Sequence, residues 1–210
     1  MKSFEYVDQN EWAPAREDLF KLIHLVQKEV SEYFTFRFDL IGSASRRMIT
    51  REVNGNIGYD FDVNIRVNDP NENFTAEQIR KILRYGFDKH SRYFSYDFSE
   101  DSTRVICIKV KDKKHSKILY SCDFAVVFDC SDGRQQYIRF DKKQGSYYWE
   151  YQPKGFYKID EKIADIKKAN LWQEVRELYL RKKCNNNDAN KKSRSIFAET
   201  INEIHNYYFC

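Results

Sequence analysis

The chain has 210 residues, of which 41% are hydrophobic and 32% charged, a balance that indicates a soluble globular protein and excludes disordered and fibrous classes. Its net charge of +4 is too mild to require a nucleic-acid partner. No stretch approaches the roughly 18 apolar residues of a membrane span, and the N-terminal residues include Glu5 and Asp8 without an apolar run. We therefore expect a cytoplasmic protein with no signal peptide and no membrane partner.

Helix and strand patterns alternate in the first part of the chain. Acidic residues and apolar residues at helical spacing follow Pro14, which suits the first turn of a helix. Asn54-Gly55 and Gly58 are turn chemistry, and Thr75 is a suitable N-cap. The predicted elements are a helix over residues 14–33, a strand over 36–41, a short helix from Ser43, a strand over 59–67 and a helix over 75–89.

Strands dominate the middle of the chain and helices its last part. The change in composition falls at Pro153 and Gly155. Before it we predict strands over residues 104–110 and 118–128 and a hairpin with arms 136–140 and 147–151; after it we predict helices over 159–168, 171–183 and 193–208. The expected fold class is α+β, with a sheet-containing core over residues 1–152 and a helical C-terminal lobe over residues 153–210.

Two carboxylates share one face of the strand predicted over residues 59–67. Residues i and i+2 of a strand point to the same side, so Asp60 and Asp62 face away from Tyr59 and Phe61. Neighbouring ionised carboxylates repel and need water, basic partners or a divalent cation. Carboxylate oxygens together with substrate phosphates suit Mg²⁺. A solvated strand face is the alternative interpretation of the same pattern.

A third carboxylate and a glycine turn extend this pattern. Asp123 interrupts an otherwise apolar strand, where an unpaired carboxylate is costly, and a strand beside the first pair would bring all three together. Asp129 ends the same strand, where an exposed Asp is ordinary. Gly42-Ser43 follows a strand, and such a turn lets the backbone approach a phosphate closely. Arg46 is a candidate for additional positive charge there, with a solvated arginine as the alternative.

The ordered set resembles the DNA polymerase beta-like nucleotidyltransferase superfamily. Its pattern is a hydrophobic residue, Gly, then Gly or Ser, a spacer, an Asp-hydrophobic-Asp strand and a third Asp on a later strand. Ile41-Gly42-Ser43, Asp60-Phe61-Asp62-Val63 and Asp123 match this pattern position by position, over about residues 36–128. Sixteen residues separate Ser43 from Asp60, a longer spacer than the pattern has, so we expect an inserted turn around residues 54–58.

The resemblance implies a mixed sheet flanked by helices, a nucleoside triphosphate on the Gly42-Ser43 turn, and two Mg²⁺ ions held by Asp60, Asp62 and Asp123. It implies that an acceptor hydroxyl attacks the α-phosphate and pyrophosphate leaves, with Asp123 activating the acceptor. The helical tail resembles, more loosely, the second lobe of the oligoadenylate synthetase and cyclic GMP-AMP synthase branch. There Lys182 and Ser193 are candidates to grip the triphosphate, and exposed helix ends are the alternative.

The acceptor is open from sequence: a small molecule, a nucleotide, an RNA end or a protein side chain all fit. The choice of nucleotide and the oligomeric state are equally open. Two alternative functions stay beside the enzyme. One is a catalytically inactive nucleotide- or nucleic-acid-binding module on the same fold. The other is an interaction protein whose Asp-Phe-Asp segment is only a solvated face.

Overall fold

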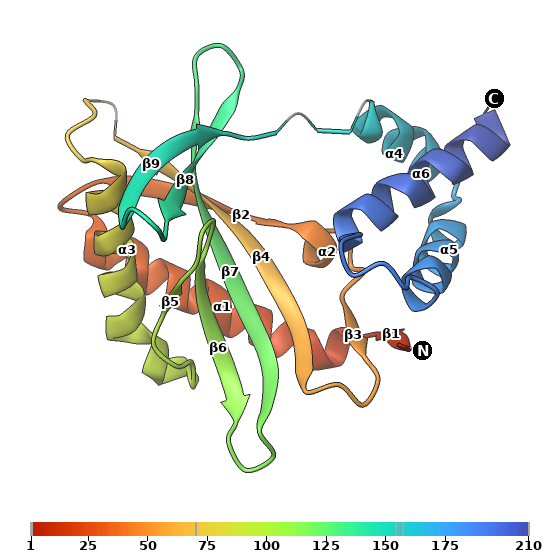
Figure 1. The fold of residues 1–210 in the computed structure, drawn as a ribbon, viewed down its shortest axis with the longest axis horizontal. Helices are drawn as coiled ribbons and strands as arrows, with labels where there is room; N and C mark the ends of the chain where they lie inside the picture. The colour runs from red at the N-terminus through yellow and green to blue at the C-terminus, as the bar shows by residue number, and fades with distance from the viewer. Residues whose placement is uncertain (1, 70, 154, 157, 210) are drawn as a thin grey trace. The chain divides into compact units, whose positions relative to one another are not determined.

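In the computed structural model, which describes residues 2–69, 71–153, 155–156 and 158–209, the architecture centres on two long parallel strands. These are β4 (Ile57–Asn68) and β7 (Lys117–Asp129), which are separated in sequence by a helix, a short 3₁₀ helix and two further strands. They are the middle of a seven-stranded mixed sheet with the order β2-β4-β7-β6-β5. The remaining strands, β8 and β9, continue from the end of β7 as a hairpin (Figure 1). The expected α+β class is confirmed.

The other strands of this sheet are β2 (Thr35–Ile41), β5 (Glu100–Asp101), β6 (Ile106–Asp112), β8 (Gln135–Asp141) and β9 (Ser146–Tyr151). Helices α1 (Gln9–Val30) and α3 (Ala76–His90) cover one face of it (Figure 1). The core lies between these helices and the sheet. There Phe61 and Val63 of β4 and Phe124 of β7 are fully buried with Leu22 of α1 and Leu83 of α3. This burial leaves the opposite face of β4 for its polar residues.

Helix ends follow the capping chemistry, with one difference from the sequence prediction. Thr75 caps α3, as expected from the sequence, and it also forms a capping box with Gln78. Helix α1 begins at Gln9 rather than at residue 14, because the Asp8 side chain accepts from the Asn10 amide at 2.7 Å. Pro14 consequently lies in the second turn of α1 rather than at its start.

A second group of elements packs around the C-terminal helices α4 (Ile159–Lys168), α5 (Trp172–Cys184) and α6 (Ser193–Phe209). Backbone contacts divide the chain into two compact units, and this one also includes residues 2–6 and 50–54. Strands β1 (Phe4–Tyr6) and β3 (Thr50–Glu52) pair there in antiparallel fashion. The Tyr6 hydroxyl donates to the Arg176 carbonyl of α5 at 2.7 Å. The proposed functional division at residue 152 stays a prediction.

The long spacer between Ser43 and Asp60 holds α2 (Gly42–Ser45), strand β3 and a turn at Val53 and Asn54. The turn was expected, whereas β3 was not, because its pairing partner β1 is distant in sequence. A short 3₁₀ helix at Ser91–Phe94 was also not predicted. Within the described ranges, no helix has a stretch long and apolar enough to cross a bilayer.

Candidate active site

Asp60 and Asp62 lie on the face of β4 opposite the core, as the strand periodicity predicts. Tyr59, Phe61 and Val63 are buried, while Asp60 is exposed and Asp62 half-buried. The alternation arises because the apolar side chains of β4 pack beneath α1 and α3. The two carboxylates therefore project from the face of the sheet that these helices leave uncovered.

Asp123 lies directly beside Asp62. Strands β4 and β7 run parallel, with Asp62 opposite Asp123 and Asp60 opposite Ser121. The buried residues Cys122 and Phe124 alternate with Asp123, so it shares the face of the first pair. The structure thus places the three predicted carboxylates on adjacent positions of two neighbouring strands.

The electrostatics of these carboxylates reflect their crowding. Burial, together with the charges of Asp123 and Asp60, raises the pKa of Asp62 from 3.8 to about 6, and Arg46 partly opposes this rise. Burial also raises the pKa of Asp123, and a hydrogen bond from the Cys107 thiol counteracts the effect. Arg46 and Lys109 offset this crowded negative charge only in part, an electrostatic setting that suits a bound cation.

Gly42 makes room for Asp62. It follows Ile41, which pairs with Asp62 across β2 and β4. Its φ is +66°, and a Cβ built there would lie 2.3 Å from Oδ2 of Asp62. Only glycine meets both demands, a left-handed backbone and an approach this close. The glycine of the sequence pattern therefore has a steric role against a carboxylate as well as its expected role near a phosphate.

Two polar neighbours of the carboxylates escaped sequence reasoning. The Ser121 hydroxyl donates to Oδ1 of Asp60, and Ser121 is only 7% exposed. Cys107 of β6 pairs with Asp123, and its thiol is near enough to lower the pKa of that carboxylate. The signal for Ser121 was present, since it stands two residues before Asp123, but its partner depends on strand register.

The carboxylates at this site are donors of the kind that Mg²⁺ takes. Within the described ranges, no three His, Cys, Asp or Glu side chains form a ready metal-binding group. Mg²⁺ typically takes one or two carboxylates and completes its shell with water and substrate phosphates. The adjacent Asp62 and Asp123 fit that requirement. Asp60 lies two residues before Asp62 on β4 and accepts a hydrogen bond from the Ser121 hydroxyl.

The remaining predicted residues lie in different places. Gly42 and Ser43 begin α2, and Arg46 is the residue that follows this helix. The positive charge of Arg46 lowers the pKa of Asp62. Asp129, set aside as an ordinary strand end, is paired with Arg66 and Gln135.

In the C-terminal unit, Ser193 lines a pocket of about 530 Å³ with Lys183, Lys191 and Lys192. Lys182 instead forms ion pairs with Glu203 at 2.6 Å and Glu199 at 3.0 Å. Contact of Lys182 and Ser193 with a triphosphate stays a prediction.

No protein-family model matches the sequence, and no curated protein matches it. Solved structures match by fold. Vibrio cholerae DncV bound to GTP aligns with a TM-score of 0.59 and 15% identity over 94% of this chain and 52% of that one. The chain has the fold of the CD-NTases. This similarity of fold confirms the structural resemblance expected from sequence.

Further CD-NTase structures agree. DncV in complex with the linear intermediate 5′ pppA(3′,5′)pG aligns with a TM-score of 0.58 at 14% identity, over 94% of this chain and 54% of that one. Bradyrhizobium diazoefficiens CdnG with GTP aligns with a TM-score of 0.53 at 14% identity, over 74% of this chain and 42% of that one. The chain thus spans about half the length of these CD-NTases.

Proposed function

We propose that the protein is a Mg²⁺-dependent nucleotidyltransferase that transfers a nucleoside monophosphate from a nucleoside triphosphate to an acceptor hydroxyl, releasing pyrophosphate. The observation that carries this proposal is the side-by-side placement of Asp62 and Asp123 on parallel strands, next to a glycine whose Cβ would collide with Asp62. The CD-NTase fold supports it.

Each residue has a role in this proposal. Asp60, Asp62 and Asp123 would hold two Mg²⁺ ions, which when bound would neutralise the carboxylates and the substrate phosphates. Ser121 keeps Asp60 oriented through its hydroxyl. Asp123 is proposed to take the proton of the acceptor hydroxyl, and Gly42, Ser43 and Arg46 to contact the triphosphate. Lys182 and Ser193 are proposed as triphosphate ligands from the C-terminal unit.

A nucleotide is the first acceptor to test. DncV is a cyclic AMP-GMP synthase, and one of its structures holds a linear dinucleotide intermediate. We propose by analogy that the acceptor hydroxyl here belongs to a second nucleotide. A small molecule, an RNA end and a protein side chain are the other acceptors to include.

The direct test is to incubate the protein with Mg²⁺, labelled nucleoside triphosphates and these acceptors, and to compare it with Asp60→Ala. Wild type should release pyrophosphate and the variant should lose that activity. Equal release by both proteins would refute the proposal. Asp129→Asn is the matched control, because Asp129 is the last residue of β7 in the same sheet and is already paired with Arg66.

The catalytically inactive nucleotide-binding module on the same fold is the second candidate. Isothermal titration separates the two. Nucleotide binding that requires Mg²⁺ and leads to turnover supports the enzyme. Binding that is indifferent to Mg²⁺, without turnover, supports the inactive module. An interaction protein would show no Mg²⁺-dependent rise in melting temperature.

A further inference from the structure

A cavity of about 370 Å³ lies in the sheet-containing unit, between the start of α3 and the ends of β4, β7 and β9. Val67 of β4 forms part of its floor, five residues beyond Asp62, which is roughly 16 Å along the strand. The pocket is therefore separate from the carboxylate site. Its volume is within the range typical of small-molecule pockets.

Aromatic rings form the walls of this pocket. Phe74 comes from the loop before α3, Phe128 from β7 and Trp149 from β9. The rings of Phe128 and Trp149 have centroids 6.1 Å apart and are inclined by 57°, while Phe74 is held edge-on by Phe34 at 5.8 Å. Rings from three elements thus line one cavity instead of packing solely against one another.

Carboxylates are the only charged groups among the described lining residues. Asp69 and Glu72 both line the pocket, and the lining residues that the structure describes include no Lys or Arg. Asp69 is 8% exposed, and its oxygens accept from the backbone amides of Asn73 at 3.1 Å and Phe74 at 2.9 Å. The bonded loop therefore presents negative charge and an aromatic ring to the same cavity, an arrangement that repels anions and attracts cations.

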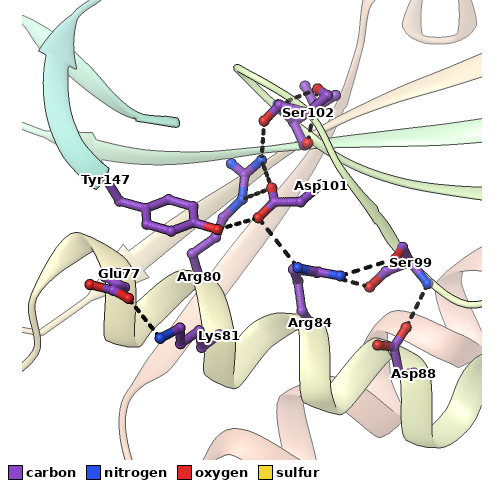
Figure 2. A network of polar contacts seen from close by, with 10 residues as sticks. Glu77, Arg80, Lys81, Arg84, Asp88, Ser99, Asp101, Ser102 and Tyr147 are labelled. Atoms are coloured by element: carbon purple, nitrogen blue, oxygen red, sulfur yellow. Dashed lines mark hydrogen bonds and ion pairs between the residues drawn. The ribbon is translucent and has the colours of Figure 1, made fainter. Parts of the chain in front are cut away.

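A polar network holds the wall formed by β9 in place (Figure 2). Arg80 of α3 is fully buried and donates through Nε and Nη2 to Oδ1 of Asp101 at 2.9 and 2.6 Å. The Tyr147 hydroxyl donates to Oδ2 of Asp101 at 2.6 Å. Trp149 is two residues further along β9 and so shares the face of Tyr147. The network thus fixes Trp149 relative to α3 before any ligand arrives.

We propose that this pocket binds a small organic cation with an alkylated ammonium group. Aromatic rings attract such a cation, and three of them line the pocket. Asp69 and Glu72 complement its charge, and its alkyl groups suit the apolar floor. The proposal is independent of nucleotidyl transfer, because the pocket and the carboxylate site are built from different residues.

The test is isothermal titration calorimetry of the full chain with choline and, in a parallel experiment, with trimethyl-lysine. Saturable binding with a dissociation constant of about 1 mM or lower is expected for both, because they share the alkylated ammonium group, and the tighter one indicates whether the cation is free or carried on a lysine. The control ligand is 3,3-dimethylbutanol, which has the shape of choline without its charge. It should bind at least about fivefold more weakly.

Variants on one strand provide the matched comparison. Trp149→Ala should weaken choline binding at least about fivefold, whereas Tyr148→Ala, on the opposite face of β9 and 40% exposed, should leave it unchanged. The proposal is overturned if neither cation binds, if the neutral isostere binds as tightly as choline, or if both variants bind choline like wild type. The comparison of choline with its isostere uses wild type only, so it decides the matter even if Trp149→Ala misfolds.

Discussion

Asp62→Asn should stabilise the metal-free protein even though it should abolish the proposed activity. Burial and the neighbouring Asp123 and Asp60 raise the pKa of Asp62 from 3.8 to about 6. A shift of roughly two pKa units means that the ionised carboxylate costs the folded state about 3 kcal/mol. Asparagine has nearly the same shape and no charge, so the variant should recover up to that amount.

The dependence on pH gives the prediction its sign. Because the folded-state pKa of Asp62 lies above its unfolded value, the cost is complete above about pH 6 and disappears as the pH falls towards about 4. In urea unfolding with EDTA, the variant should be more stable than wild type near pH 7.5. The difference should shrink at about pH 4.5. At about 2–4 °C per kcal/mol for a chain of this size, the melting temperature should rise by several degrees near pH 7.5.

Asp129→Asn is the control for this experiment. Hydrogen bonds from Gln135 and Arg66 hold the pKa of Asp129 below its usual range, so removing its charge should not stabilise the fold. An Asp62→Asn variant no more stable than wild type near pH 7.5, or a stability gain that persists unchanged in acid, would show that carboxylate repulsion does not destabilise the metal-free site.

Three other substitutions test neighbouring parts of the structure. Gly42→Ala should lower the melting temperature more than Gly133→Ala, because both have positive φ but a Cβ would meet Asp62 only at residue 42; equal losses would contradict a steric role. Arg80→Met should cost about 1–3 kcal/mol in urea unfolding, because Asp101 loses the donors of a fully buried Arg80 and keeps those of Tyr147 and Arg84, and a loss below about 0.5 kcal/mol would contradict it. Ser121→Ala should weaken calorimetric Mg²⁺ binding about tenfold through loss of its hydrogen bond, and Ser121→Thr should restore it; unchanged affinity in Ser121→Ala would show that the hydroxyl does not position the carboxylate.

Local patterns predicted most of the elements. Hydrophobic alternation along residues 59–67 and the capping chemistry at Thr75 depend on neighbours in sequence, so the strand and the helix α3 could be found without a structure. The same locality explains the misses. Strand β3 depends on pairing with β1, and the start of α1 depends on Asp8, whose capping role competes with the signal from Pro14.

The sequence by itself determined the side of the strand on which Asp60 and Asp62 lie, because a strand places alternate side chains on opposite faces regardless of its partners. It also supplied the third carboxylate and the glycine. Only the tertiary structure decided that Asp62 stands beside Asp123, that Ser121 holds Asp60 and that Gly42 touches Asp62. Those contacts depend on the register between strands that are distant in sequence, and register is set by packing of the whole sheet against its helices.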